Sequence, residues 1–473
     1  MALKLHLDRS NRTPLSEQIR AGIAAAIRNG VLSPGMRLPS WIDLATQLGV
    51  SRGTVKAAYD RLTDAQLVVP LGAGGTRVAS QPCRQARNPS FDGAGRHSLM
   101  YPAFDASPSC PIVFRMGVPG MDCLPTALLA RLQAKAARAK AREPALYPSA
   151  LGESDLRREI AVHLALARGI ECLPEQIIVT TGFSGALGLA LQTLRLEKRE
   201  AWVEDPGFPP SRKALTLSGF NLIPVPVDDH GLDVEQGIRQ APDATLVLTT
   251  PSQQAPTGAT LSLDRRMGLL EWAEQVGAWI IEDDYLGELQ LKRRAAPALA
   301  SLDRSGRVIH IGSFSKTIGP TLRLGFIVAP LALLERFAIA ANCLAPAPEP
   351  VVQMTISRFM SEGHYMRHLR RTKRLYTQRA DALRAELGRL GLTTKLAGLA
   401  LLLKLPPSSS DQKIARQAYS QGLAPSPLSM WCCSLKQEVR SGLLLGVSNI
   451  DRNELEPICG RLRQLIEKDG EAS

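Results

Sequence analysis

The sequence predicts an α/β protein with two folded domains, the larger of which is expected to contain a doubly wound, mostly parallel sheet. The chain has 473 residues, more than the roughly 100–200 residues of one typical domain. From about residue 113 onward, short β-branched runs alternate with amphipathic helical segments. Residues 80–112 are rich in Pro, Ser, Gly and Arg and lack periodicity, which predicts a linker between domains at 1–79 and 113–468.

Composition narrows the class of protein. Hydrophobic residues make up 45% and charged residues 21%, which excludes a chain dominated by disorder. The net charge is +13, and the first 80 residues hold ten Lys/Arg against five Asp/Glu, which favours an anionic partner such as nucleic acid. Eight cysteines form no CxxC motif or Cys/His cluster, so we expect no metal site and a reducing, cytoplasmic location. No signal peptide is recognisable, and no apolar run reaches the ~18–20 residues of a membrane span.

The first helix and a hairpin frame the N-terminal domain. An apolar stripe over Leu15–Ile27 predicts a helix, with Thr13 as its expected cap. Two β-prone runs, Leu67–Leu71 and Thr76–Ala79, flank four residues that are mostly glycine, which predicts a hairpin. Arg77 on this hairpin could reach a phosphate of DNA.

Two short helices are predicted between these elements. Ser40, followed three residues later by Asp43, is typical of a capping box, and Gly49 ends the helix that they begin. Ser51 caps the next helix. Two helices joined by a tight turn, the second carrying polar side chains at its start, have the geometry that enters a major groove. Its exposed residues are expected to be Arg52, Thr54 and Lys56.

This segment resembles the GntR-type winged helix-turn-helix. The matching stretches include PLSEQIRAGI, LSPGMRLPS and LATQLGVSRGTVKAAYDRL. The resemblance implies DNA contacts by Arg37, Ser51, Arg52 and Thr54. Ile42 stands where the family usually has a DNA-contacting arginine, so affinity or operator preference is expected to differ.

Seven β-branched runs predict the strands of the large domain. They are Ile177–Thr181, Ala201–Glu204, Leu222–Val227, Thr245–Thr249, Trp279–Glu282, Val308–Ile311 and Leu324–Val328. Amphipathic segments lie between them, as in a doubly wound sheet. Ligands of such sheets bind at the carboxyl ends of the strands.

Polar motifs follow three of these strands. Residues 180–186 (TTGFSGA) open a helix whose N–H groups can hold a phosphate. Glu282–Tyr285 (EDDY) brings a carboxylate suited to a protonated ring nitrogen. Ser313–Lys316 (SFSK) is followed seven residues later by Arg323. Hydroxyls, a lysine and an arginine together are what a phosphate beside a Schiff-base lysine requires.

Residues 113–465 resemble fold-type I aminotransferases, which have a smaller α+β C-terminal subdomain, and the whole chain resembles MocR-type regulators. The match includes VTTGFSGALGLAL, WIIEDDYLGEL and SFSKTIGPTLRLGF. It implies pyridoxal phosphate bound covalently to Lys316, with Asp283 at the ring nitrogen and Tyr285 at the phenolic oxygen. The phosphate would be held by Ser313, Ser315, Arg323, Phe183 and Ser184.

Two further aromatic residues and one acidic neighbour are also candidates for this site. The resemblance places Phe208 near the ring and Tyr147 at the phosphate of the neighbouring subunit, so a homodimer is expected. Core packing is the alternative for both aromatic residues. Asp284 is the rival of Asp283.

The aminotransferase pattern fails at a cofactor contact and at the expected substrate clamp. The family's Asn-Pro-x-Gly becomes Ala255 and the following three residues, so the amide that would touch the cofactor's phenolic oxygen is missing, although Gln254 is adjacent. Ser-His-Gln becomes Ser-Gln-Gln at 252–254. No arginine that could clamp a substrate carboxylate occurs near residues 443–448. The candidates to replace it are Arg212, Arg440 and Arg452.

Three functions remain open from the sequence. The first is a transcription regulator that binds double-stranded promoter DNA under the control of pyridoxal phosphate, alone or as an adduct with an amine or amino acid. The second is an active aminotransferase with a fused DNA-binding module, so turnover is left undecided. The third is a DNA-binding protein whose large domain is only a dimerisation scaffold. The intact Lys316, Asp283 and Arg323 favour the first over the third.

Overall fold

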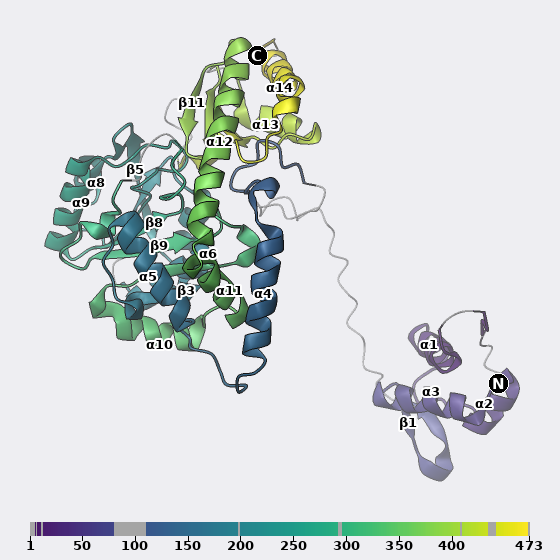
Figure 1. The fold of residues 1–473 in the computed structure, drawn as a ribbon. Helices are drawn as coiled ribbons and strands as arrows, with labels where there is room; N and C mark the ends of the chain where they lie inside the picture. Colours follow the sequence, from purple (N-terminus) through teal and green to yellow (C-terminus); the bar gives the residue numbers. More distant parts are fainter. Residues whose placement is uncertain are drawn as a thin grey trace. The chain divides into compact units, whose positions relative to one another are not determined.

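The computed structural model describes residues 5, 7–10, 13–79, 110–196, 199–291, 296–406, 409–433 and 441–471. The chain divides into two compact units, residues 1–99 and 100–473 (Figure 1), and each is described by itself. Most of the predicted linker, residues 80–109, lies outside the described residues.

The N-terminal unit packs three helices against a two-stranded hairpin. The helices are α1 (Leu15–Arg28), α2 (Trp41–Leu48) and α3 (Arg52–Asp64). Strands β1 (Val68–Pro70) and β2 (Thr76–Val78) pair antiparallel. Every helix contributes to the core, as Ile23, Leu44 and Leu62 show by their complete burial. The predicted helices and hairpin are therefore confirmed.

Side-chain caps fix the turn between α2 and α3. Ser40 Oγ accepts a hydrogen bond from the Asp43 N–H at 3.1 Å, and Ser51 Oγ accepts one from the Thr54 N–H at 3.1 Å. Gly49 adopts a left-handed φ of 64° between them. The prediction that Thr13 caps α1 is wrong. Pro14 is the extended residue before the helix, so the Thr13 side chain comes one position too early.

The large unit is built on an eight-stranded sheet of order β3-β10-β9-β8-β7-β4-β5-β6. All seven predicted runs form strands. The strands are β3 (Ile177–Thr180), β4 (Glu200–Asp205), β5 (Asn221–Asp228), β6 (Gly231–Leu232), β7 (Leu246–Thr249), β8 (Trp279–Asp284), β9 (Val308–Ser313) and β10 (Gly325–Val328). Strands β9, β8, β7, β4 and β5 are parallel, whereas β10 runs antiparallel to both of its neighbours.

Helices cover both faces of this sheet. Because successive side chains of a strand point to opposite faces, neighbouring residues contact different helices. The helices are α4 (Thr126–Lys140), α5 (Ser154–Arg168), α6 (Gly182–Leu194), α7 (Pro209–Leu217), α8 (Val234–Gln240), α9 (Leu263–Val276), α10 (Leu334–Leu344) and α11 (Pro350–Ser361). Ile281 packs with residues of α6 and α10, while its neighbour Ile280 packs with residues of α8 and α9. By the same alternation, Asp283 shares the face of Ile281, and Glu282 and Asp284 share the opposite face.

A C-terminal subdomain of mixed structure follows, as predicted. Its sheet has the order β11-β12-β14-β13, from β11 (Thr394–Ala397), β12 (Ala400–Lys404), β13 (Ser426–Pro427) and β14 (Gly442–Gly446). Helices α13 (Asp411–Ser420) and α14 (Leu455–Glu471) accompany it, so α14 continues past the expected boundary at residue 468. None of the described helices has the length and apolarity to cross a membrane.

The helix α12 (His364–Arg389) belongs to two cores at once. Near its start, Tyr365 and Leu369 pack with α5 and α11 beside the large sheet. Farther along, Leu383 and Leu387 are buried in the core of the C-terminal subdomain. Figure 1 shows this helix running from the helices beside the large sheet to the C-terminal subdomain. It therefore ties the subdomain to the sheet that carries the site.

Gly258 offers a test of a second contact between the large-sheet part of this unit and the C-terminal subdomain, the contact with Ala397 of β11. Its φ is +73°, and a Cβ there would lie 2.9 Å from the Cα of Ala397. We expect Gly258→Ala to lower the free energy of unfolding of the large unit by about 1–3 kcal/mol, measured by urea denaturation. Gly268→Ala is the matched control, because Gly268 lies in α9 with open space around its Cα. That change should instead raise stability by about 0.5–1 kcal/mol, and equal effects of the two would contradict the packing described.

Candidate functional site

Lys316 lies in the loop after β9, with its amine partly buried. Its Nζ donates a hydrogen bond to the carbonyl of Gly117 at 3.0 Å. Burial lowers the pKa of Lys316 to about 8, against the opposing effect of the Asp283 carboxylate. A sizeable share of this amine is therefore neutral near physiological pH, and a neutral amine is a nucleophile.

Asp283 and Tyr285 lie at the end of β8 with polar atoms that are not paired. Asp283 is 7% exposed, and no hydrogen bond joins its carboxylate to any described residue. Burial, together with the negative charges of Asp284 and Glu204, raises its pKa well above the usual range. The Tyr285 hydroxyl likewise has no hydrogen-bond partner among the described residues, and burial raises its pKa. Buried polar groups are normally satisfied, so this pair fits a ligand that brings its own donors.

Hydroxyls, a helix start and an arginine meet beside these residues. Ser313 Oγ donates to Ser315 Oγ at 2.9 Å and accepts from the Ser315 N–H at 3.1 Å. Arg323 has a left-handed φ of 47°, an uncommon conformation for a residue other than glycine. Its guanidinium lies next to Gly182, the first residue of α6. The next residues are Phe183 and Ser184, in a turn whose N–H groups lack intrahelical partners and favour an anion.

The two aromatic candidates have different surroundings. Phe208 packs against Phe183 and Trp431, with ring centroids 6.3 Å and 5.8 Å apart. Tyr147 is fully exposed at 102%, which excludes core packing for its side chain within this chain. An exposed tyrosine is available to a second subunit.

Asp284, the rival of Asp283, faces the other side of the sheet. Its Oδ2 pairs with Arg168 Nε at 2.7 Å, and both side chains are almost fully buried. Arg168 also donates to the Ala296 carbonyl at 2.6 Å and to the Ser252 hydroxyl. The acid that faces Lys316 is thus Asp283, and its contact with a ring nitrogen stays a prediction.

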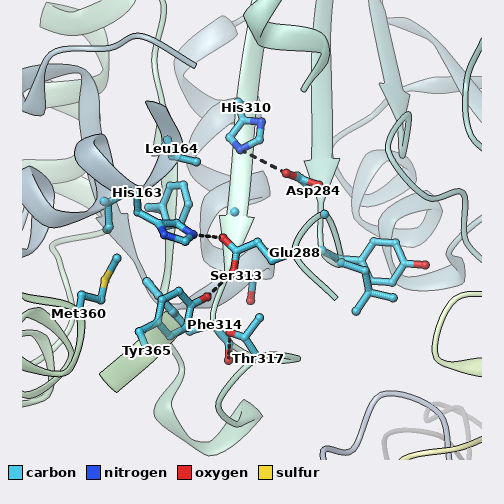
Figure 2. A pocket seen from close by; sticks show the side chains of 16 residues that line it. His163, Leu164, Asp284, Glu288, His310, Ser313, Phe314, Thr317, Met360 and Tyr365 are labelled. Carbon is cyan, nitrogen blue, oxygen red and sulfur yellow. Dashed lines mark hydrogen bonds and ion pairs between the residues drawn. The ribbon is translucent and has the colours of Figure 1, made fainter. Parts of the chain in front are cut away.

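A pocket behind the Lys316 loop contains a cluster that sequence reasoning missed. Figure 2 shows His163, Glu288 and Tyr365 pointing toward one another below His310. Glu288 accepts a hydrogen bond from the Tyr365 hydroxyl at 2.6 Å and pairs with His163. Burial disfavours the protonated form of His163, but the Glu288 carboxylate outweighs it and raises the pKa of His163. Ser313 and Thr317 also line this pocket, so the cluster supports the loop that carries the lysine.

Glu282 is the most deeply buried acid of β8. His310 Nδ1 lies 3.0 Å from its Oε2, and the N–H groups of Leu299 and Ala300 donate to it. Burial alone would raise the pKa of Glu282, but His310 and these N–H groups outweigh it and lower the pKa. The described residues contain no group of three His, Cys, Asp or Glu side chains that could hold a metal ion.

The candidates for a carboxylate clamp are not supported by the structure. The terminal nitrogens of Arg212 donate to the carbonyls of Gly207, Met430, Trp431 and Cys432. Its interpretation as a ligand-binding arginine is therefore wrong, because backbone oxygens occupy both nitrogens. Arg452 is exposed and donates to the Gln378 carbonyl at 3.2 Å. Arg440 lies outside the described residues.

Gln254 does not replace the missing asparagine either. Its amide nitrogen donates to Glu204, to the Pro206 carbonyl and to the Ala255 carbonyl. Its oxygen accepts from Thr257. These bonds join the amide to the backbone of the turn and to the side chains of Glu204 and Thr257, so the amide is not available to a ligand.

The N-terminal unit presents a basic surface at α3 and the hairpin. Arg52 and Lys56 are exposed on the first turns of α3. The Ser51 and Thr54 hydroxyls lie 2.7 Å apart and bond to each other, so they complete the cap. On the hairpin side, two arginines meet in a β-bridge and both are exposed, namely Arg37 and Arg77. Arg77 also donates to the Gly35 carbonyl at 2.9 Å, and Ile42 is 40% exposed on α2.

Two protein families account for almost all of the chain. Residues 15–78 match the bacterial regulatory proteins of the gntR family, and residues 114–462 match aminotransferase class I and II. The chain is 34% identical to the probable rhizopine catabolism regulatory protein MocR of Rhizobium meliloti, over 97% of this chain and 95% of that protein. It is 35% identical to the HTH-type pyridoxine biosynthesis transcriptional regulator PdxR of Corynebacterium glutamicum, with 82% of each covered.

Solved structures agree for the large unit. An archaeal alanine:glyoxylate aminotransferase superposes with a TM-score of 0.69 at 24% identity, over 76% of this chain and 91% of that chain. This similarity shows that the large unit has the fold of fold-type I aminotransferases.

The ion pair behind the site gives a stability prediction. Arg168→Met would leave Asp284 buried without its partner, so we expect a loss of about 3–5 kcal/mol in the free energy of unfolding. The control is Arg158→Met on the same helix, where an exposed pair with Asp155 contributes within about 0.5 kcal/mol. Urea denaturation of both variants measures the difference. A loss for Arg168→Met as small as that of the control would contradict the role of the pair.

Proposed function

The chain belongs to the MocR-type transcription regulators, with a gntR-family domain before an aminotransferase class I and II domain, and from this premise we propose that a cofactor held at Lys316 controls its binding to promoter DNA. The observation that carries the proposal is the buried, unpaired Asp283 beside the partly neutral Lys316. These residues fit pyridoxal phosphate, the cofactor of this class of domain.

Each residue of the site has a role in holding that cofactor. When bound, pyridoxal phosphate supplies an aldehyde carbon for amines and a ring that withdraws electrons. Lys316 would bond to it covalently, and Asp283 would accept a hydrogen bond from its ring nitrogen and keep that nitrogen protonated. Tyr285 would donate to its phenolic oxygen. The phosphate would lie among Ser313, Ser315, Arg323 and the turn at Phe183 and Ser184.

Loss of the substrate contacts favours regulation over turnover. An aminotransferase must hold its amino acid by the carboxylate so that the lysine can move a proton. Ala255 replaces the usual asparagine, and Arg212 is bound to four backbone carbonyls. A ligand that merely occupies the site still changes its interactions, and a ligand that binds two states differently shifts their populations.

The proposal includes the partners and the location. The exposed Tyr147 supports a homodimer in which it reaches the phosphate of the second subunit. The basic surface of Arg37, Arg52, Lys56 and Arg77 would contact double-stranded DNA, with α3 in the major groove. The effector would be pyridoxal phosphate itself or an amine or amino acid that meets it. A regulator of promoter DNA would act in the cytoplasm.

Two variants separate the two halves of this function. An operator is first selected from a random pool of duplex DNA by the wild-type protein. Lys316→Ala should lack the visible absorption band that the wild type gains with pyridoxal phosphate, and its affinity for the operator should no longer respond to the cofactor. Arg52→Ala should keep the band but lose about 1–3 kcal/mol of DNA-binding free energy.

The charge-matched control is Arg239→Ala on α8, an exposed residue of the large unit. It should change neither readout. Selection that enriches no sequence would overturn the proposal. Steady turnover of amino and keto acids, with operator affinity indifferent to the cofactor, would favour the aminotransferase alternative.

The lowered pKa of Lys316 predicts how cofactor loading depends on pH. Only the neutral amine can bond to an aldehyde, so the loading rate should rise about tenfold per pH unit below the pKa and level off above it. The midpoint is expected near the Lys316 value of about 8. The rate at which the visible band grows in apo-protein between pH 6 and 10 measures this midpoint. The control is Nα-acetyl-lysine in solution, whose ε-amine is free. A protein midpoint as high as that of the free amine would contradict the assignment of Lys316 as a buried nucleophile.

A further inference from the structure

We infer that the ligand admitted beside Lys316 is an amine with an apolar body and no carboxylate. This inference rests on the proposed function and narrows its effector from amines and amino acids to one chemical class. It is carried by the side chains that surround the place where the ligand body would lie.

An apolar cluster adjoins the lysine. Its buried members are Ala255, Ala397, Trp431 and Leu444, and the partly buried residues packed on them are Met116, Phe208, Tyr285, Leu402 and Met430. Met116 directly precedes Gly117, whose carbonyl accepts the Lys316 amine at 3.0 Å. The cluster therefore begins one residue from the reactive nitrogen.

Apolar residues occupy two stretches where the family pattern is lost, the turn at Ala255 and the strand that lacks a carboxylate-binding arginine. Ala255 is 7% exposed in the place of an asparagine, and Leu444 is completely buried in the middle of β14. The strand around Leu444 reads Gly-Leu-Leu-Leu-Gly, so none of its side chains is charged. An amino acid would thus bring its carboxylate into surroundings without a cation on this strand.

Two arginines that flank the cluster in the sequence, among the residues that the structure describes, are already engaged. Arg212, which follows Phe208, binds four backbone carbonyls. Arg115, which precedes Met116, is buried and donates to Cys110 Sγ at 2.6 Å. Turning either toward a ligand would break bonds that hold the backbone or side chains in place.

One polar atom at the edge of the cluster suits an amine. The amide oxygen of Gln253 is buried and has no hydrogen-bond partner. Its side chain lies close to Gly398, as does the Tyr285 hydroxyl. An unpaired acceptor gives no partner to a carboxylate, which offers only acceptors, so this edge of the cluster does not compensate the burial of that group.

These surroundings discriminate between ligands by desolvation. A carboxylate that leaves water must be paired with a cation or with several donors, or the cost of its burial opposes binding. An alkyl or aromatic body gains free energy on entering the same cluster. We therefore expect an amine to bind at least about tenfold more tightly than the amino acid that differs from it by one carboxylate.

Matched pairs test this on the full-length protein loaded with pyridoxal phosphate. The pairs are 2-phenylethylamine with phenylalanine and isopentylamine with leucine, compared at equal concentrations of the neutral amine. Titration followed by visible absorption and by calorimetry gives the affinities. Tighter binding of both amines supports the inference. Equal or tighter binding of the amino acids overturns the inference about the effector and leaves the proposed function standing. A wild-type protein without a Lys316-dependent visible band overturns both the inference and the proposed function.

A substitution adds a second test. Leu444→Arg should restore a carboxylate partner and reverse the preference toward the amino acids. Leu331→Arg is the control, because Leu331 is 64% exposed and the change adds the same charge to the surface. If thermal unfolding shows that Leu444→Arg does not fold, the wild-type pairs decide the question. A folded Leu444→Arg protein that still prefers amines would contradict the assignment of Leu444 to the ligand site.

Discussion

Three consecutive acidic residues end the central strand β8, and the rest of the site is arranged around them. Like charges that are this close cannot all remain ionised in a buried environment without partners. The pleat separates them, sending Asp283 to one face and Glu282 and Asp284 to the other. His310 and two N–H groups satisfy Glu282, and Arg168 pairs with Oδ2 of Asp284. Asp283 accepts no hydrogen bond from any described residue, and the Lys316 amine is the cation that faces it.

The framework around this strand explains why the loop of Lys316 holds its shape. The His163 and Glu288 pair lies behind that loop, and Tyr365 completes it from the start of α12. Since α12 also contributes to the core of the C-terminal subdomain, the same helix joins that subdomain to the core beside the large sheet. Arg212 adds a second connection, because its side chain donates hydrogen bonds from α7 to the backbone carbonyls of residues 430–432. The site thus lies where the turn at Ala255 packs against the C-terminal subdomain.

Local features of the structure could be predicted from the sequence, whereas contacts across the chain could not. Runs of β-branched residues located every predicted strand, because the pleat and burial leave a local signature. The antiparallel direction of β10 leaves none, since a strand has the same pattern in both directions. Arg212 was misjudged because the Trp431 carbonyl that it binds is 219 positions away. The contact of His163 with Glu288 could not be predicted for the same reason, because the two residues are 125 positions apart in the sequence. The two motifs that contain Asp283 and Lys316 were visible because each lies at the end of a predicted strand.

The apolar cluster beside Lys316 has a thermal consequence. A ligand body enclosed by Phe208, Trp431 and Leu444 would withdraw hydrocarbon surface from water, and such association carries a negative change in heat capacity. The enthalpy of association then decreases steadily on warming and passes through zero. Affinity reaches its maximum at that temperature and declines on either side of it. A regulator built on such a site would respond to its effector most sensitively within one band of temperature, which an ion pair at the same place would not impose.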